Sequence, residues 1–123
     1  MSSDPPEEIR LKDHGRILEV QYGPNETYAL AAEYLRVESP SAEVQGHGPG
    51  QKTIVAGRRH VGILALEPVG NYAVRIRFDD LHDTGIFSWA YLHELGRRHD
   101  QLWRTYLHGL AEQGLSREPE RRS

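Results

Sequence analysis

The chain has 123 residues, with 15 Lys and Arg against 18 Asp and Glu, and no cysteine. This length fits one domain, and the net charge of -3 argues against a dedicated binder of nucleic acid or of acidic membranes. Without cysteine, disulfides, thiolate zinc sites and cysteine nucleophiles are excluded. No apolar run approaches the roughly 18 residues of a membrane span, and the first residues lack the character of a secretion signal. We therefore expect a soluble, cytoplasmic domain.

Both ends of the chain are polar. Residues 1–8 carry three carboxylates and two prolines, and residues 116–123 contain no apolar side chain. Such segments bury too little surface to offset the entropy cost of ordering them. We therefore expect two disordered tails and a single folded domain over residues 9–115.

The N-terminal part of that domain predicts a hairpin. Residues 9–12 alternate between apolar and polar side chains, and residues 16–22 continue the alternation after a connection at 13–15 that ends in glycine. Glycine suits a connection that needs a positive φ. Residues 27–37 indicate a short strand followed by one or two helical turns, which end before Pro40.

The middle of the chain predicts a second hairpin. Residues 60–66 are apolar on both faces, which indicates a central strand. A turn at residues 68–71 leads into residues 72–78, where apolar side chains from Tyr72 to Phe78 alternate with outward-facing arginines. We expect Tyr72 and Phe78 to belong to the core.

The C-terminal third changes to helical spacing. Ser88 can cap a short helix over residues 89–95 that stops at Gly96. Apolar residues between 102 and 110 then recur at helical intervals, which predicts an amphipathic helix closed by Gly114. The sequence therefore predicts an α+β fold. We expect a mostly antiparallel sheet built from hairpins, with the short helix and the C-terminal amphipathic helix covering one face.

Known catalytic motifs are incomplete. The segment 46–53, which reads GHGPGQKT, comes close to a phosphate-binding loop. Gln51 stands where that motif needs its second glycine, and Pro49 removes a backbone N–H group that would face a phosphate. We interpret the segment as a surface loop. Serine-nucleophile elbows and paired-histidine zinc motifs are missing too, so we expect the protein not to be an enzyme.

Four side chains that can ligate a metal follow the second hairpin: Asp79, Asp80, His82 and Asp83. Oxygen and nitrogen ligands at this density could hold an iron or zinc ion. The alternative is a polar turn, in which the aspartates accept backbone N–H groups and cap the following helix. The same residues could also perform acid–base chemistry in a pocket that shifts a pKa. The residues alone leave these alternatives open.

An interaction surface is the other candidate site. Arg58 and Arg59 could belong to a basic strip that attracts an anionic partner. The nearly neutral charge of residues 9–115 weakens that electrostatic argument. The surface that we expect to contact a protein partner comprises His47, Gly48, Gly50, Arg58 and Arg59.

Three stretches resemble the gamma-butyrobetaine hydroxylase-like N-terminal domain family. They are residues 34–44 (YLRVESPSAEV), 46–51 (GHGPGQ) and 74–92 (VRIRFDDLHDTGIFSWAYL), and the resemblance spans about residues 9–96. In carnitine-pathway hydroxylases this module precedes an oxygenase domain that holds iron and 2-oxoglutarate. There it binds a structural zinc ion through three clustered cysteines and one histidine.

The resemblance places His82 at the zinc-binding histidine and the cysteine cluster at residues 39–42, which here read SPSA. Hydroxyl groups are poor substitutes for thiolates, so we expect no zinc site of that kind. This chain holds no oxygenase domain, so we also expect no hydroxylase activity from it. Other family members are fused to P-loop ATPases of the iron–sulfur carrier type, which implies an accessory role in the maturation of iron–sulfur proteins.

We therefore hypothesise a non-catalytic accessory or binding module. The partner that the resemblance implies is an iron–sulfur carrier ATPase, and we expect no nucleic-acid or membrane partner. The alternative hypothesis is a metal-binding protein that holds iron or zinc through His82 and the neighbouring aspartates.

Overall fold

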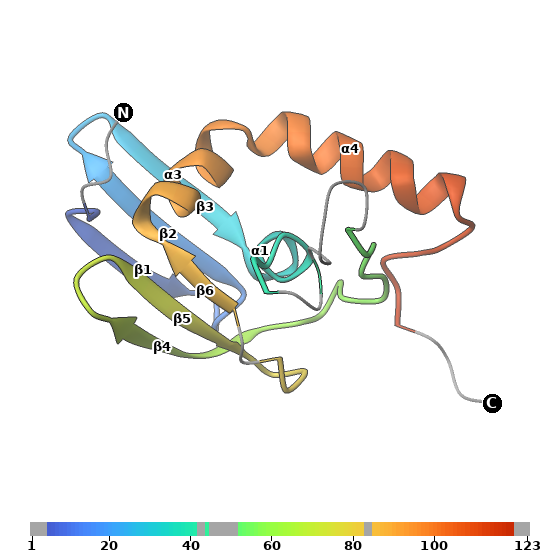
Figure 1. Cartoon of the computed structure of the whole chain (residues 1–123), viewed down its shortest axis with the longest axis horizontal. Coiled ribbons are helices and arrows are strands. Elements are labelled where there is room, and N and C mark those ends of the chain that lie inside the picture. Colours follow the sequence, from blue (N-terminus) through green and yellow to red (C-terminus); the bar gives the residue numbers. More distant parts are fainter. Residues whose placement is uncertain (1–4, 42–43, 45–51, 83–84, 120–123) are drawn as a thin grey trace.

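The computed structural model describes residues 5–41, 44, 52–82 and 85–119. Two three-stranded antiparallel sheets form within these ranges, and together with the helices they confirm the expected α+β class (Figure 1). The first sheet has the order β1 (Glu8–Lys12), β2 (Ile17–Gly23), β3 (Glu26–Ala31). The second has the order β4 (Ile63–Val69), β5 (Ala73–Phe78), β6 (Gly85–Ser88). The helices are α1 (Ala32–Val37), α3 (Trp89–Arg97) and α4 (His99–Glu112).

The predicted first hairpin is confirmed, and its turn also joins the two sheets. Asp13, His14 and Gly15 all have positive φ, at 53°, 56° and 85°. A Cβ on Gly15 would lie 2.4 Å from the carbonyl oxygen of Ile63, so glycine is required for this close approach. The Gly15 carbonyl oxygen in turn accepts the Ile63 N–H at 2.8 Å. This contact connects the start of β4 to the first sheet.

The core lies between the two sheets and is closed by helices. In Figure 1, β6 and α3 lie across the strands of the first sheet, and α4 runs past α1. Both sheets, α1 and α3 contribute to one cluster of fully buried side chains, which includes Leu18, Val20, Leu30, Leu35, Ile76, Phe78, Phe87, Leu92 and Leu95. Among the described residues, none of the helices has the length and apolar character that crossing a membrane requires.

The second hairpin is confirmed, but two details of its prediction were wrong. The predicted central strand is β4, which lies at the edge of the β4-β5-β6 sheet, where β5 is its one partner among the described strands. Its edge position explains why Pro68 fits inside the strand, since an edge residue has no partner for its N–H on the outer side. Leu64 lies at a register shift of this strand and is 64% exposed. Tyr72 belongs to the turn before β5 and is 59% exposed, not part of the core.

The C-terminal helices were predicted correctly except for one boundary, while strand β6 was missed. The Ser88 side chain caps α3 by accepting the Tyr91 N–H at 3.1 Å. The helix then continues through Gly96 to Arg97. Gly96 does not end the helix; it allows close packing, because a Cβ there would lie 2.5 Å from the ring of Tyr28.

Residues 116–118 contact the domain. The Arg117 guanidinium donates two hydrogen bonds to the buried Glu33 carboxylate, at 2.7 and 2.8 Å, and lies 5.2 Å from the centre of the Trp103 ring. At the other end, Glu8 already belongs to β1. Glu8 and Arg117, which lie just outside the expected domain of residues 9–115, therefore both contact it.

Replacing Gly96 by alanine is expected to destabilise the protein. In an open helical position alanine would stabilise by about 1 kcal/mol, but here the new Cβ would push against the Tyr28 ring, at a cost of about 1–3 kcal/mol. Gly109 in α4 is the matched control, since a Cβ there meets only the flexible end of Ile54, at 2.8 Å. Urea unfolding should show a lower free energy of unfolding for Gly96→Ala but not for Gly109→Ala. Equal effects of the two substitutions would contradict this packing.

Candidate functional site

The turn between β5 and β6 is held in place by its own backbone. The Phe78 N–H donates to the His82 carbonyl oxygen at 2.9 Å, and the Asp79 N–H donates to the Gly62 carbonyl oxygen at 2.9 Å. The Leu81 N–H donates to the Phe78 carbonyl oxygen at 3.3 Å. Residues 79–82, which we name the polar turn, thus have a defined conformation that continues from β5.

The carboxylate of Asp80 ties this polar turn to two distant parts of the chain. Its Oδ2 accepts hydrogen bonds from Arg36 Nε of α1 at 2.8 Å and from Arg58 Nε at 2.7 Å. Its Oδ1 accepts the His82 backbone N–H at 3.1 Å. The Arg36 side chain is only 8% exposed, and its Nη1 has no hydrogen-bond partner within the described ranges. Asp80 therefore supplies the countercharge that this buried guanidinium needs.

These contacts also determine the ionisation of Asp80. Burial alone would raise the pKa of Asp80. The hydrogen bond from Arg36, the His82 N–H and the charges of Arg36 and Arg58 outweigh burial, so this pKa lies below its ordinary value. Asp80 is therefore a carboxylate at neutral pH and acts as a structural anion.

The His82 side chain contacts two buried serines. Its Nε2 lies 2.9 Å from Ser39 Oγ and 3.4 Å from Ser41 Oγ. A Cβ on Gly85 would lie 2.7 Å from Ser39 Oγ, so the glycine leaves room for this contact. Ser39, Ser41 and His82, which we name the serine–histidine cluster, connect the chain after α1 to the polar turn.

Three of the predicted metal-binding residues, Asp79, Asp80 and His82, lie in the described part of the chain, and they do not form a metal-binding group there. The Asp80 oxygens are occupied by the two arginines and the His82 N–H, while His82 Nε2 faces hydroxyl groups. The Asp79 carboxylate lies against Gly62. Across residues 5–41, 44, 52–82 and 85–119, no three His, Cys, Asp or Glu side chains are grouped so that they could hold a metal ion. The fourth predicted ligand, Asp83, lies outside these residues.

The predicted partner surface is described only in part. His47, Gly48 and Gly50 lie outside the described residues. Arg58 also donates to the Ala56 carbonyl oxygen at 3.0 Å, in addition to its bond with Asp80. Arg59 pairs with Glu118 at 2.6 Å and remains half exposed. Both arginines therefore have internal anionic partners, which weakens the expected basic strip.

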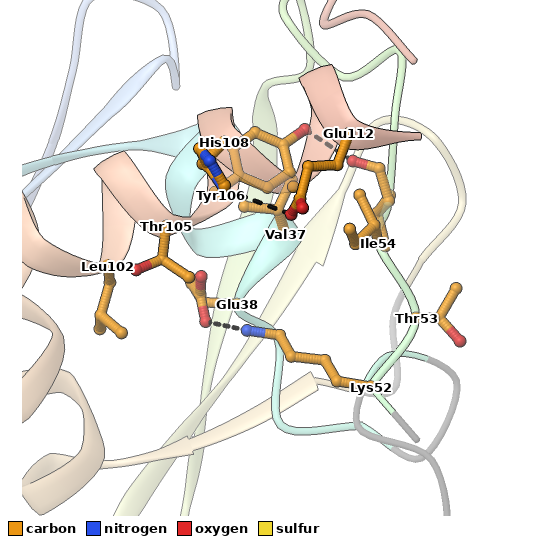
Figure 2. Close-up of a pocket in the computed structure, with 12 residues that line it drawn as sticks. Val37, Glu38, Lys52, Thr53, Ile54, Leu102, Thr105, Tyr106, His108 and Glu112 are labelled. Atoms are coloured by element: carbon orange, nitrogen blue, oxygen red, sulfur yellow. Dashed lines mark hydrogen bonds and ion pairs between the residues drawn. The ribbon is translucent and has the colours of Figure 1, made fainter. Parts of the chain in front are cut away.

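An apolar groove beside α4 was not predicted from the sequence. It encloses about 250 Å³ between α4, the end of α1 and the extended segment 52–55 (Figure 2). The residues that line it include an ion pair between Lys52 and Glu38, at 2.6 Å, and a side-chain contact between His108 and Glu112, at 3.2 Å. Its apolar lining includes Val37, Ile54, Leu102 and Tyr106.

Sequence reasoning missed the groove because it assigned the apolar face of α4 entirely to the core. The Tyr106 hydroxyl donates to the Val55 carbonyl oxygen at 2.7 Å and so holds one wall against the other. Burial raises the pKa of Tyr106 to about 12, so the hydroxyl keeps its proton and remains a donor. The sequence features that could have predicted the groove are the apolar residues at helical spacing between 102 and 110 and the isoleucine and valine of segment 52–55.

Comparison with known proteins identifies the family. The model of the gamma-butyrobetaine hydroxylase-like N-terminal domain matches residues 9–93, so the chain belongs to that family. Two solution NMR structures are similar to it: one at 47% identity with a TM-score of 0.83, covering 97% of this chain and 94% of the other, and one at 42% identity with a TM-score of 0.79, covering 98% and 89%. No curated protein matches the chain.

A crystal structure from Acidithiobacillus ferrooxidans is also similar, at 40% identity with a TM-score of 0.62, covering 76% of this chain and 94% of the other. That protein is described as one of unknown function in the DUF971 family. The comparisons therefore establish the family and leave the biochemical role to be inferred from the site.

The zinc site that the family resemblance implies does not fit this chain. The structure does bring Ser39 and Ser41, from the expected cysteine positions, next to the expected histidine ligand His82. Their hydroxyl groups are protonated at neutral pH and ligate zinc poorly, unlike thiolates. A hydrogen-bonded cluster occupies the position that thiolates and histidine would need for zinc.

Neutralising Asp80 should destabilise the protein and change its acid sensitivity. Asp80→Asn leaves the buried Arg36 without a countercharge, which costs about 3 kcal/mol in the free energy of unfolding. The pKa of Asp80 is lower in the folded than in the unfolded state. Its contribution to the free energy of unfolding is therefore fully present above the ordinary carboxyl pKa, and it is lost as the pH falls through the pKa of the folded state. Urea unfolding between about pH 6 and 2.5 should therefore show a shallower acid loss for Asp80→Asn than for the wild type.

Asp100→Asn is the control for this experiment, because the Asp100 side chain is 93% exposed. Its stability and acid dependence should match those of the wild type. If Asp80→Asn behaved like this control, Asp80 would not be the countercharge of Arg36.

Metal removal should leave the protein folded. Protein purified without a histidine tag should contain no stoichiometric zinc or iron, and EDTA should not change its Tm. The control variant His108→Ala removes an exposed histidine from α4 and should give the same result. One metal ion per chain that is lost in His82→Ala but retained in His108→Ala would instead support the metal-binding hypothesis.

Proposed function

We propose that this chain is a non-catalytic accessory module that binds a protein partner of the iron–sulfur carrier ATPase type. Family membership supports the partner class, since the resemblance implies association with such ATPases. Without cysteine the chain has no thiolate with which to hold a cluster itself. The partner would therefore carry the cluster, and this module would contribute recognition. A cytoplasmic location belongs to the same proposal, because a cysteine-free chain suits a reducing compartment.

The observation that carries the proposal is the internal use of the polar turn. Asp80 neutralises two arginines, and His82 is buried against Ser39 and Ser41. An acid–base residue needs access to substrate and a pKa near neutrality, but Asp80 has a lowered pKa and is committed to its arginines. Two of the four candidate side chains, Asp80 and His82, thus cross-link the fold. This leaves the exterior as the functional part of the domain.

Direct binding tests the proposal. The purified full-length chain should bind a purified iron–sulfur carrier ATPase from the same organism with a micromolar dissociation constant, measured by isothermal titration calorimetry. A P-loop ATPase of an unrelated class serves as the control and should give no binding heat. Absence of binding to the carrier ATPase, or equal binding to the control ATPase, would refute the proposed function.

A further inference from the structure

Leu81 at the tip of the polar turn combines two unusual properties. Its side chain is 88% exposed, although leucine is strongly apolar. Its φ is 72°, in the left-handed region that a bulky residue rarely adopts. Each property alone has simple explanations, and single exposed leucines are common on protein surfaces. Their combination is what requires an explanation.

Interactions of the neighbouring residues hold Leu81 in this conformation. Asp80 is fixed by Arg36 and Arg58 and accepts the His82 N–H, while the His82 carbonyl oxygen accepts the Phe78 N–H. The two residues that flank Leu81 are therefore anchored to the body of the domain. Because several interactions fix both neighbours, an unfavourable backbone conformation can persist at Leu81.

The leucine side chain itself contributes little to the fold. With so much of its surface in solvent, it buries little against the domain, and asparagine or glycine would suit its backbone better. Leu64 on β4 is also exposed, at a register shift of the strand, but its φ is not positive. Strained positions of this kind concentrate at functional sites. Leu81 thus has the features of a side chain kept for contact with another molecule.

We propose that Leu81 is an anchor residue that inserts into an apolar pocket of a protein partner. The inference rests on the proposed function and identifies the contact surface of that partner as the polar turn. A rigidly presented side chain loses little conformational freedom on binding, which favours affinity from a small contact. The partner is a protein and not a lipid surface, because membrane binding requires a much larger apolar area than one leucine.

Two substitutions at this position test the anchor. Leu81→Asn suits the left-handed backbone and removes the apolar side chain. It should leave Tm unchanged or raise it by about 1–4 °C, while weakening binding to the carrier ATPase about tenfold or more. Leu81→Met retains an apolar side chain of similar volume and should bind within about threefold of the wild type. Leu64→Asn is the matched control and should bind like the wild type.

The outcomes separate this inference from the proposed function. If the wild type does not bind the carrier ATPase, the proposed function fails, and the anchor fails with it for this partner. If the wild type binds and Leu81→Asn binds equally well, only the anchor is refuted. A lower Tm for Leu81→Asn would show that the leucine supports the fold and would also refute the anchor.

Two further measurements exclude other contact surfaces. Thr105→Arg places a large side chain in the groove beside α4. If this variant loses binding while Leu81→Asn retains it, the groove is the interface and the anchor is refuted. Sedimentation equilibrium at about 100 μM should show the wild type and Leu81→Asn with the same molecular mass. If the wild type is a dimer and Leu81→Asn is a monomer, then Leu81 contacts a second copy of this chain. That result would refute the proposed contact with another protein.

Discussion

The ion pair between buried Arg36 and Asp80 is the constraint on which the rest of this structure depends. A guanidinium that is removed from water needs a fixed countercharge, and Asp80 supplies it while also binding Arg58 and the His82 N–H. Three segments far apart in sequence therefore meet at one carboxylate: α1, the chain before β4, and the polar turn after β5. Together with the backbone hydrogen bonds of residues 78–82, this contact fixes the position of that turn.

A second consequence concerns the position that the family resemblance assigns to zinc, where the described residues form polar cross-links. The serine–histidine cluster joins the chain after α1 to the polar turn, at the position that the family resemblance assigns to zinc. Hydrogen bonds and an ion pair can hold two segments together without thiolates, provided that each polar group is satisfied. In our account Asp80 and His82, the two residues best suited to metal binding or acid–base chemistry, stabilise the fold instead. Recognition is left to the exterior, where Leu81 stands exposed on a fixed backbone.

Local patterns in the sequence predicted the parts of the fold that local physics determines. Strand alternation and the turn at residues 13–15 gave the first hairpin, and the Ser88 cap gave the start of α3. Long-range packing determined the rest. Gly96 was interpreted as a helix end because glycine usually ends helices, whereas here it accommodates the Tyr28 ring. The pairing of Arg36 with Asp80 joins residues 44 apart in sequence, a contact that no local pattern encodes. The groove beside α4 was missed for the same reason.

Amide hydrogen exchange at His82 tests the central claim most directly, because the N–H of His82 donates to Asp80 Oδ1 within the cross-link. If the polar turn is an integral part of the fold, this amide should exchange only through global unfolding, with the same protection as buried amides of β5. The Asp80→Asn variant should then reduce the protection of His82 in step with its loss of global stability. Exchange of the His82 amide at the rate of an exposed loop in the wild-type protein would contradict the account.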